Sequence, residues 1–247
     1  MVYLVLGMHK SGTTLLSKTL SASGIEMGCI TNCDYDNKGG QFECPETQSL
    51  NMELLKCSQS TFSLDVYKPV SLNELNKEQI KKMSNLIHKF NKKYRSDWGF
   101  KDPRTCLLWD SWIHCIPKCR VIAVWRDPRE VLKHYVPDRP LYKQSPSRIF
   151  RAYKTLRGWY YHNYCIIKAI EKHEESLLLN YASFMKNRNS INKLQAFLGI
   201  ELKDLRADHM YRNKSSDSLL FKIGLVLCWV GGLDVLSLES KLSDMTC

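Results

Sequence analysis

Residues 2–24 of this 247-residue chain read VYLVLGMHKSGTTLLSKTLSASG, and this stretch decides the fold. Its first five residues are apolar and partly β-branched with no polar alternation, which is typical of a strand buried on both faces. Leu16 and Leu20 then recur at helical spacing, which predicts a helix over 14–23 that Gly24 ends. A strand, a glycine-rich turn and a helix in succession indicate the first βα unit of an α/β fold.

The turn GMHKSGTT, which joins that strand to that helix, is suited to hold an anion. A turn of this kind directs several backbone N–H groups toward one point at the positive end of the helix dipole. It keeps Gly7, Gly12 and Thr14 of the triphosphatase signature G-x-x-x-x-G-K-S/T, but has Thr13 in place of the signature lysine and a lysine earlier, at Lys10. Triphosphate chemistry relies on the missing lysine and on magnesium. A transferring sulfuryl group carries less charge, so the variant turn favours sulfate transfer.

The rest of the chain repeats the βα pattern. Apolar runs predict further strands at 98–101, 120–125 and 176–180. Helical periodicity predicts a helix that starts at 71–73 and extends through 83–94, one over 107–116, one that begins at Pro128, one over 149–170 and one over 191–198. We therefore expect a P-loop-type, three-layer α/β fold whose central, mostly parallel sheet is flanked by helices. We expect two parts in the chain: a domain over residues 1–202, and a helical extension of undetermined role over residues 203–247.

The composition is that of a globular protein with an affinity for anions. Hydrophobic residues make up 44% of the chain, and the formal net charge is +11. The basic residues are dispersed rather than clustered, which argues against nucleic acid as a partner and for a localised anion pocket. The ten cysteines form no C-x-x-C pairs with nearby histidines, so we expect no metal site.

The two ends of the chain give expectations about location. The first strand begins at residue 2, which leaves no room for a signal peptide, and we expect a cytoplasmic protein with reduced cysteines. The apolar stretch 219–236 is interrupted by charged and glycine residues and is short for a span of about 20 residues. We expect a docked helix there, and membrane association is not expected.

Five blocks together resemble one known family, the sulfotransferases that use 3′-phosphoadenosine 5′-phosphosulfate (PAPS). In chain order they are GMHKSGTTLL, NKGGQFE at 37–43, WGFKDPRTCLLW at 98–109, VIAVWRDPREVL at 121–132, and LLLNYASF followed by FLGI, which ends at residue 200. The resemblance covers about residues 1–202. It implies that PAPS is the co-substrate, that no metal is used, and that the sulfuryl group is transferred to a hydroxyl or amine acceptor. A carbohydrate is one possible acceptor.

The resemblance also assigns nucleotide-binding residues. It implies that the 5′-phosphosulfate is held by Lys10, Ser11, Gly12, Thr13 and Thr14. Arg126 matches the arginine that holds the 3′-phosphate, and its fork of donors suits a phosphate. A serine commonly stands eight residues later in the family, where this chain has His134. His134 can still donate a hydrogen bond, but it is a departure from the pattern.

Catalysis needs a cation for the leaving group and a base for the acceptor proton. Lys10 is the preferred cation, and Lys101 resembles a family lysine near the sulfuryl group. Glu43 matches an acidic position of the related branch and is the preferred base. Glu46 and His9 are alternatives for this role.

Several of these residues also have structural interpretations. Arg126 can form an ion pair with Asp127 or Glu130, and Asp102 and Arg104 can pair with each other to shape their loop. The aromatic residues of 159–164 can line an acceptor groove, although such a stripe more often belongs to the core.

Two other functions compete with a sulfotransferase. One is a P-loop kinase or another nucleotide-triphosphate-binding protein, which needs the missing lysine and an acidic magnesium ligand after a buried strand. The other is a non-catalytic binder of anionic glycans with a degenerate sulfotransferase fold.

Overall fold

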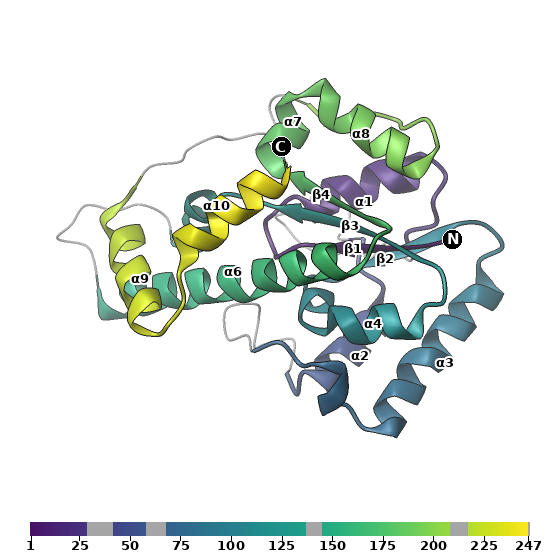
Figure 1. Cartoon of the computed structure of the whole chain (residues 1–247), viewed down its shortest axis with the longest axis horizontal. Coiled ribbons are helices and arrows are strands. Elements are labelled where there is room, and N and C mark those ends of the chain that lie inside the picture. Colours follow the sequence, from purple (N-terminus) through teal and green to yellow (C-terminus); the bar gives the residue numbers. More distant parts are fainter. Residues whose placement is uncertain (29–41, 58–67, 137–144, 208–216, 247) are drawn as a thin grey trace.

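A four-stranded parallel sheet forms the centre of the molecule (Figure 1). The computed structural model describes residues 1–28, 42–57, 68–136, 145–207 and 217–246. Its strands are β1 (Val2–Leu6), β2 (Trp98–Lys101), β3 (Cys119–Trp125) and β4 (Ser176–Asn180). They lie in the order β2-β1-β3-β4, and every neighbouring pair is parallel. The predicted strands and the parallel sheet are therefore confirmed.

Helices cover both faces of the sheet because the strand side chains alternate between two cores. Tyr3 and Val5 point into a core shared with α1 (Thr13–Ala22), α7 (Tyr181–Lys186) and α8 (Arg188–Leu198). Leu4 and Leu6 point into the larger core on the other face. The helices on that side are α2 (Pro45–Leu54), α3 (Lys77–Lys93), α4 (Trp109–Cys115), α5 (Pro128–Tyr135) and α6 (Pro146–Lys172), together with two C-terminal helices described below. This is the three-layer α/β fold expected from the sequence.

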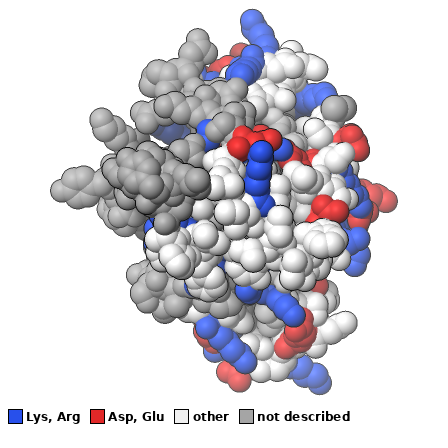
Figure 2. Space-filling model, turned by 90° about the vertical axis from the view of Figure 1, so that its left-hand side faces the viewer, with Lys and Arg blue, Asp and Glu red and all other residues white. Residues whose placement is uncertain are grey.

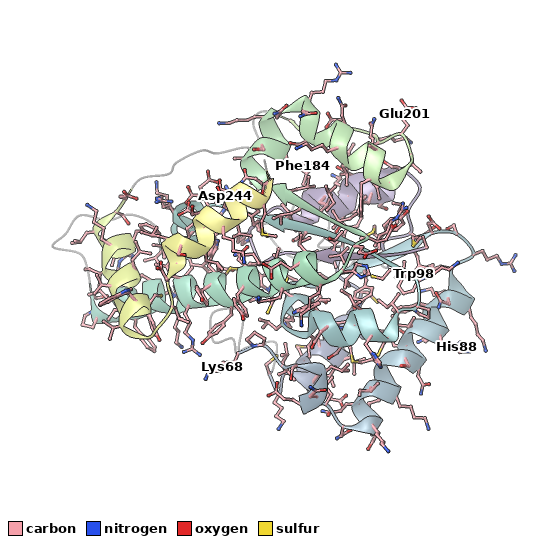
Figure 3. All side chains as sticks on the ribbon, in the orientation of Figure 1. Lys68, His88, Trp98, Phe184, Glu201 and Asp244 are labelled. Carbon is pink, nitrogen blue, oxygen red and sulfur yellow. The ribbon has the colours of Figure 1, made fainter. Side chains whose placement is uncertain are left out.

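Aromatic side chains fill the space between β2 and α3. The Trp98 ring lies 5.3 Å from that of Phe90 and 5.7 Å from that of Tyr94, measured between centroids. Figure 3 labels Trp98 between the sheet and α3. The Trp98 indole N–H also donates to Asn91 at 3.0 Å. These contacts fix the long α3 against the edge strand of the sheet.

Two of the expected helix boundaries are wrong. The helix expected from residue 71 is interrupted: Leu72–Glu74 is a short 3₁₀ helix (η1), and α3 begins at Lys77. Asn76 caps α3 by accepting from the Gln79 N–H at 2.9 Å, while the Gln79 side chain accepts from the Asn76 N–H. The helix expected over 107–116 is preceded by a 3₁₀ helix, Pro103–Leu108 (η2), which Asp102 caps. Local capping chemistry therefore outweighs the apolar periodicity at both places.

The C-terminal segment forms two helices rather than the single docked helix expected. They are α9 (Leu219–Val230) and α10 (Val235–Thr246), separated by a turn in which Gly232 has a φ of +77°. Both pack on α6, and Trp125 at the end of β3 donates from its indole N–H to Thr246 at 2.9 Å. In the described part of the chain no single helix has the length and apolar character to cross a membrane. Taken together, α9 and α10 have the length and composition, but their axes are bent by 98° relative to each other.

Candidate functional site

The candidate site lies where β1, β2 and β3 end. Because β1 lies between β2 and β3, the turn after β1 is flanked by Lys101 at the end of β2 and by Arg126 just after β3 (Figure 1). Open parallel sheets bind their ligands at this edge. The topology thus brings together residues that lie far apart in the sequence.

The glycine-rich turn is built around its own backbone. The Ser11 N–H and hydroxyl both donate to the Met8 carbonyl, at 3.2 and 2.5 Å. The Gly7 N–H donates to the Cys106 sulfur at 3.0 Å, and burial raises the pKa of that thiol to about 12, so it remains protonated. Gly12 is the N-cap of α1 and offers no side chain to the first-turn N–H groups. The N-terminus of α1 is therefore directed at the site without a side-chain cap, as an anion site requires.

The predicted loop residues differ in what they present to the site. Ser11 and Thr13 are buried, and the Ser11 hydroxyl is turned into the loop rather than out of it. Thr14 is half-buried, and so is Lys10, whose φ is +66°. Within the described residues the Lys10 ammonium makes no ion pair and donates no hydrogen bond. Lys10 is thus the cation of this turn that is available to an anion.

Tyr181, which follows β4, supports the turn and has no role in the sequence-based prediction. A Cβ added to Gly12 would lie 2.1 Å from a ring carbon of Tyr181, so the ring fills the space where a side chain would be. The Arg126 guanidinium lies 4.6 Å from the centroid of the same ring. The position of Tyr181 directly after an apolar strand, at the ligand edge of the sheet, is the signal that could have identified it.

Arg126 connects the end of β3 to the glycine-rich turn. Its Nε donates to Glu130 at 2.6 Å, and its Nη1 donates to the Lys10 carbonyl at 3.0 Å. The ion-pair interpretation of Arg126 therefore holds for Glu130 and not for Asp127, which instead accepts from the Arg129 N–H and caps α5. The Nε2 of His134 lies 3.5 Å from the Arg126 Nη1, so the structure places His134 beside the guanidinium.

One further contact fixes the Arg126 backbone and identifies the role of the aromatic stripe. The Trp159 indole N–H donates to the Arg126 carbonyl at 2.8 Å, and Trp159 is fully buried. Tyr160 and Tyr164 stack on each other farther along α6, and Tyr164 is exposed. The stripe thus divides between core and surface, and its buried member positions the arginine.

Glu43 and Lys101 form a buried ion pair. The Lys101 Nζ lies 2.7 Å from one Glu43 oxygen, and Gln48 donates to the other at 3.0 Å. Both charged residues are 5% exposed or less. Burial raises the pKa of Glu43, and the Lys101 ammonium opposes this effect. A buried carboxylate with a raised pKa is a stronger base than an exposed one, as a proton acceptor needs.

The two alternative bases are less well placed. Glu46 is bonded to Lys89 on α3, and this hydrogen bond lowers the pKa of Glu46. His9 is half-buried with its Nε2 enclosed, and desolvation together with the Arg104 and Lys101 charges lowers its pKa well below the usual value. His9 is therefore neutral near pH 7 and a weak base. The geometry therefore favours Glu43 over both as the general base, and this role of Glu43 stays a prediction.

Asp102 and Arg104 pair with each other in the loop after β2, as their structural interpretation expects. The Arg104 Nη1 lies 2.9 Å from Asp102 Oδ1, and both are buried. Asn51 on α2 donates to Asp102 at 2.9 Å and accepts from the Trp112 indole N–H at 2.9 Å. Asn51 was not foreseen, since a polar residue within a helical pattern gives no sign that it is buried.

Two further expectations concern the block at 37–43 and a metal site. Most of the block at 37–43 falls outside the described residues, so only Phe42 and Glu43 of it are placed. Among the described residues no group of three or more His, Cys, Asp or Glu side chains is arranged to hold a metal ion.

Comparisons with known proteins identify the family and the fold. Residues 3–204 match the family described as "Sulfotransferase family". The fold is similar to the sulfotransferase domain from the Synechococcus PCC 7002 olefin synthase, with a TM-score of 0.52, 15% identity and coverage of 94% of each chain. A sulfotransferase domain from the curacin biosynthetic pathway has a TM-score of 0.48 and 16% identity over 99% of this chain and 91% of that one. The comparison with curated proteins found no match.

Proposed function

Because the chain belongs to the sulfotransferase family, we propose that it transfers a sulfuryl group from PAPS to a hydroxyl or amine acceptor in one in-line step that uses no metal. The observation that carries this proposal is the convergence of three groups at one sheet edge: the N-terminus of α1, Lys10, and the Arg126 guanidinium 3.0 Å from the Lys10 carbonyl. PAPS supplies an activated sulfuryl group on a phosphate leaving group.

The two anionic ends of the co-substrate match two parts of the site. The first-turn N–H groups of α1 and the Lys10 ammonium suit the 5′-phosphosulfate, since a helix N-terminus and a nearby cation both favour negative charge. Arg126 suits the 3′-phosphate, because its guanidinium offers several donors in one plane. Glu130 holds that plane through the 2.6 Å bond to Nε and so orients the remaining donors. His134 lies within reach to contribute a further donor.

The transfer itself assigns one role to each catalytic group. The acceptor oxygen or nitrogen attacks sulfur as the bond from sulfur to the bridging oxygen breaks, and its proton passes to Glu43. Lys10 stabilises the negative charge that develops on the departing phosphate oxygen. Lys101, bonded to Glu43 at 2.7 Å, keeps the carboxylate ionised and oriented.

A ligand comparison tests the donor class directly. Adenosine 3′,5′-bisphosphate should raise the melting temperature of the chain more than ATP with magnesium does, because a ligand that binds only the native state stabilises it. Lys10→Ala should weaken this effect, and the exposed Lys81→Ala on α3 should not. Greater stabilisation by ATP would instead support a P-loop nucleotide enzyme.

An activity measurement tests the reaction. With labelled PAPS and a panel of hydroxyl and amine acceptors, including sugars, transfer should proceed in the presence of a metal chelator. Glu43→Gln should lower the transfer rate by about 10²–10⁴-fold, the usual contribution of a general base, with bisphosphate binding retained. Bisphosphate binding without transfer to any acceptor, together with retained glycan binding in both variants, would indicate a non-catalytic glycan binder.

A further inference from the structure

Helices α9 and α10 contact the junction between β3 and α5, where Arg126 lies. The match to the sulfotransferase family ends at residue 204, so both helices lie beyond it. Helix α10 packs along α6 and beside β4 (Figure 1). Its contacts at the junction indicate what this extension contributes to the candidate site.

Arg129, three residues after Arg126, joins α5 to the C-terminal helices. Its Nε donates to Asp217 at 2.8 Å, and its Nη1 donates to the two Glu239 oxygens at 2.8 and 3.0 Å. The guanidinium also lies 4.9 Å from the ring centroid of Phe221, which is buried on α9. The Asp217 side chain is 58% exposed and that of Glu239 only 20%, and water weakens an exposed ion pair. Glu239 on α10 is therefore the stronger of these two carboxylate partners.

Trp125, the residue before Arg126, is held by the last turn of α10. Its indole N–H donates to the Thr246 hydroxyl at 2.9 Å, and that hydroxyl donates to the Leu242 carbonyl at 2.5 Å. Glu239, Leu242 and Thr246 are spaced three and four residues apart, so they share one side of α10. One side of α10 therefore contacts the chain both before and after Arg126.

The charge of Arg129 is already balanced within the protein. The carboxylates of Asp127, Asp217 and Glu239 all lie within 3.3 Å of its nitrogens. Figure 2 looks onto the end of the molecule at which α9 lies, and there acidic side chains lie beside basic ones rather than in separate patches. Carboxylates around an arginine repel a phosphate that approaches it. Arg129 is therefore suited to hold its neighbours in place and not to bind the nucleotide.

Arg126 depends on the position of α5 for its orientation. Its Nη1 donates to the Lys10 carbonyl, and its Nε donates to Glu130, which follows Arg129 in the first turn of α5. Helix α5 has only 8 residues, and a helix this short is stabilised mainly by its tertiary contacts. Contacts that fix the start of α5 therefore also fix the carboxylate that orients the Arg126 guanidinium.

We infer that α10 is a positioning element for the 3′-phosphate subsite. Through Glu239 and Thr246 it holds the junction between β3 and α5, so that Arg126 faces the nucleotide. The inference rests on the proposed function, because it takes Arg126 as the ligand of the 3′-phosphate. It gives the C-terminal extension, whose role the sequence leaves undetermined, a part in nucleotide recognition.

A purely structural role of the same contacts predicts a different behaviour. If α10 only stabilised the fold, loss of its contacts would weaken the binding of every nucleotide equally or not at all. A positioning role acts on a nucleotide with a 3′-phosphate and spares one without it, such as adenosine 5′-phosphate. The ratio of the two affinities therefore separates the two roles.

Calorimetric titration of the full chain with adenosine 3′,5′-bisphosphate and with adenosine 5′-phosphate tests the inference. Glu239→Gln combined with Thr246→Val removes the charge and the hydroxyl and keeps the shapes of the side chains. Bisphosphate binding should weaken at least about fivefold, the lower end of the usual coupling between sites, and binding of the 5′-phosphate should not change. The matched control is Lys241→Gln, which breaks a 2.6 Å ion pair from α10 to Glu171 of α6 and should leave both affinities unchanged.

Two further variants separate positioning from a general loss of structure. Glu239→Gln combined with Thr246→Ser keeps the hydroxyl and should recover part of the bisphosphate affinity. Added to Arg126→Ala, the pair Glu239→Gln and Thr246→Val should weaken bisphosphate binding no further, because the residue that α10 positions is then absent.

Hydrogen exchange of the ligand-free chain tests the anchoring without any nucleotide. Protection of α5 should fall in the chain with Glu239→Gln and Thr246→Val and not in Lys241→Gln. An unchanged ratio of the two nucleotide affinities, or unchanged protection of α5, would overturn the inference. Failure of the unchanged chain to bind the bisphosphate would overturn the proposed function, and the inference with it, before any variant is compared.

Discussion

Replacing Gly12 by alanine should disrupt the turn through one identifiable contact. The added Cβ would lie 2.1 Å from one ring carbon of Tyr181 and 2.3 Å from another, distances that real Cβ atoms do not show. The ring cannot move easily, because Tyr181 is 7% exposed and lies beneath the Arg126 guanidinium at 4.6 Å. Gly12 also has a φ of +98°, which a residue with a Cβ rarely adopts. The substitution therefore combines a backbone penalty with a steric clash.

The magnitude follows from these two contributions. A left-handed conformation costs a residue with a Cβ about 1–2 kcal/mol. Overpacking a dense core costs a further ~1–3 kcal/mol, so Gly12→Ala should lower the free energy of unfolding by about 2–5 kcal/mol in total. Gly24 provides a matched control: its φ is +96°, and nothing lies within 4 Å of an added Cβ. Gly24→Ala should therefore cost only the backbone part, about 1–2 kcal/mol.

Urea unfolding of the variants measures both contributions. The difference between Gly12→Ala and Gly24→Ala isolates the clash, and adding Tyr181→Leu to Gly12→Ala should recover part of that difference. Binding of adenosine 3′,5′-bisphosphate should weaken by more than about tenfold in Gly12→Ala, because displacement of the ring moves the Arg126 guanidinium, and should be unchanged in Gly24→Ala. If both variants lost the same stability and bound the bisphosphate equally, the reasoning about Tyr181 would be refuted.

Three other perturbations test the charged groups. Burial lowers the pKa of His162 from 6.5 to about 4. As the pH falls from 7.5 to 4 the unfolded chain therefore takes up a proton at this residue before the folded chain does, and protonation of His162 alone should lower the free energy of unfolding by about 3 kcal/mol. Unfolding of the wild type and of His162→Gln as a function of pH measures this loss. Lys101→Met leaves the Glu43 carboxylate buried without its partner and should cost about 3–5 kcal/mol at pH 8. Because the pKa of Glu43 is raised by burial, that loss should shrink as the pH falls toward 4.5, and urea unfolding of Lys101→Met with Glu43→Gln should show most of the stability restored. Arg129→Ala removes bonds of 2.8 Å to both Asp217 and Glu239 and should cost about 1–3 kcal/mol, and hydrogen exchange should show reduced protection of α9 and α10 but not of α3.

The local elements could be predicted because their causes are local. An apolar β-branched run, a glycine-rich turn and leucines at helical spacing define β1, the turn and α1 within residues 2–24, whatever the rest of the chain does. The same holds for β3 and β4, which contain the continuous apolar runs VIAVW and LLL. The predicted start of α3 was wrong because capping decided it. Ser71 and Asn76 both form capping boxes, and the sequence does not show which of them begins the long helix.

The candidate site was only partly predictable because its contacts join distant residues. The sequence alone determined that Lys10 lies in a glycine-rich turn between a strand and a helix, and that Arg126 follows a buried strand. Only the tertiary structure, with its strand order β2-β1-β3-β4, decided that these groups meet, that Lys101 pairs with Glu43, and that the Tyr181 ring fills the space at Gly12. Burial and pairing depend on which surfaces pack together, and that is a property of the whole fold.

The C-terminal helices show the same division. The sequence shows that this segment is apolar, and from this it predicted a helix packed against the rest of the protein. Which side of α9 is buried was decided by its packing on α6, which covers Phe221 and Cys228 and leaves Trp229 and Val230 exposed. A sequence specifies how apolar a helix is, whereas tertiary contacts decide how much of that apolar surface the chain itself can cover.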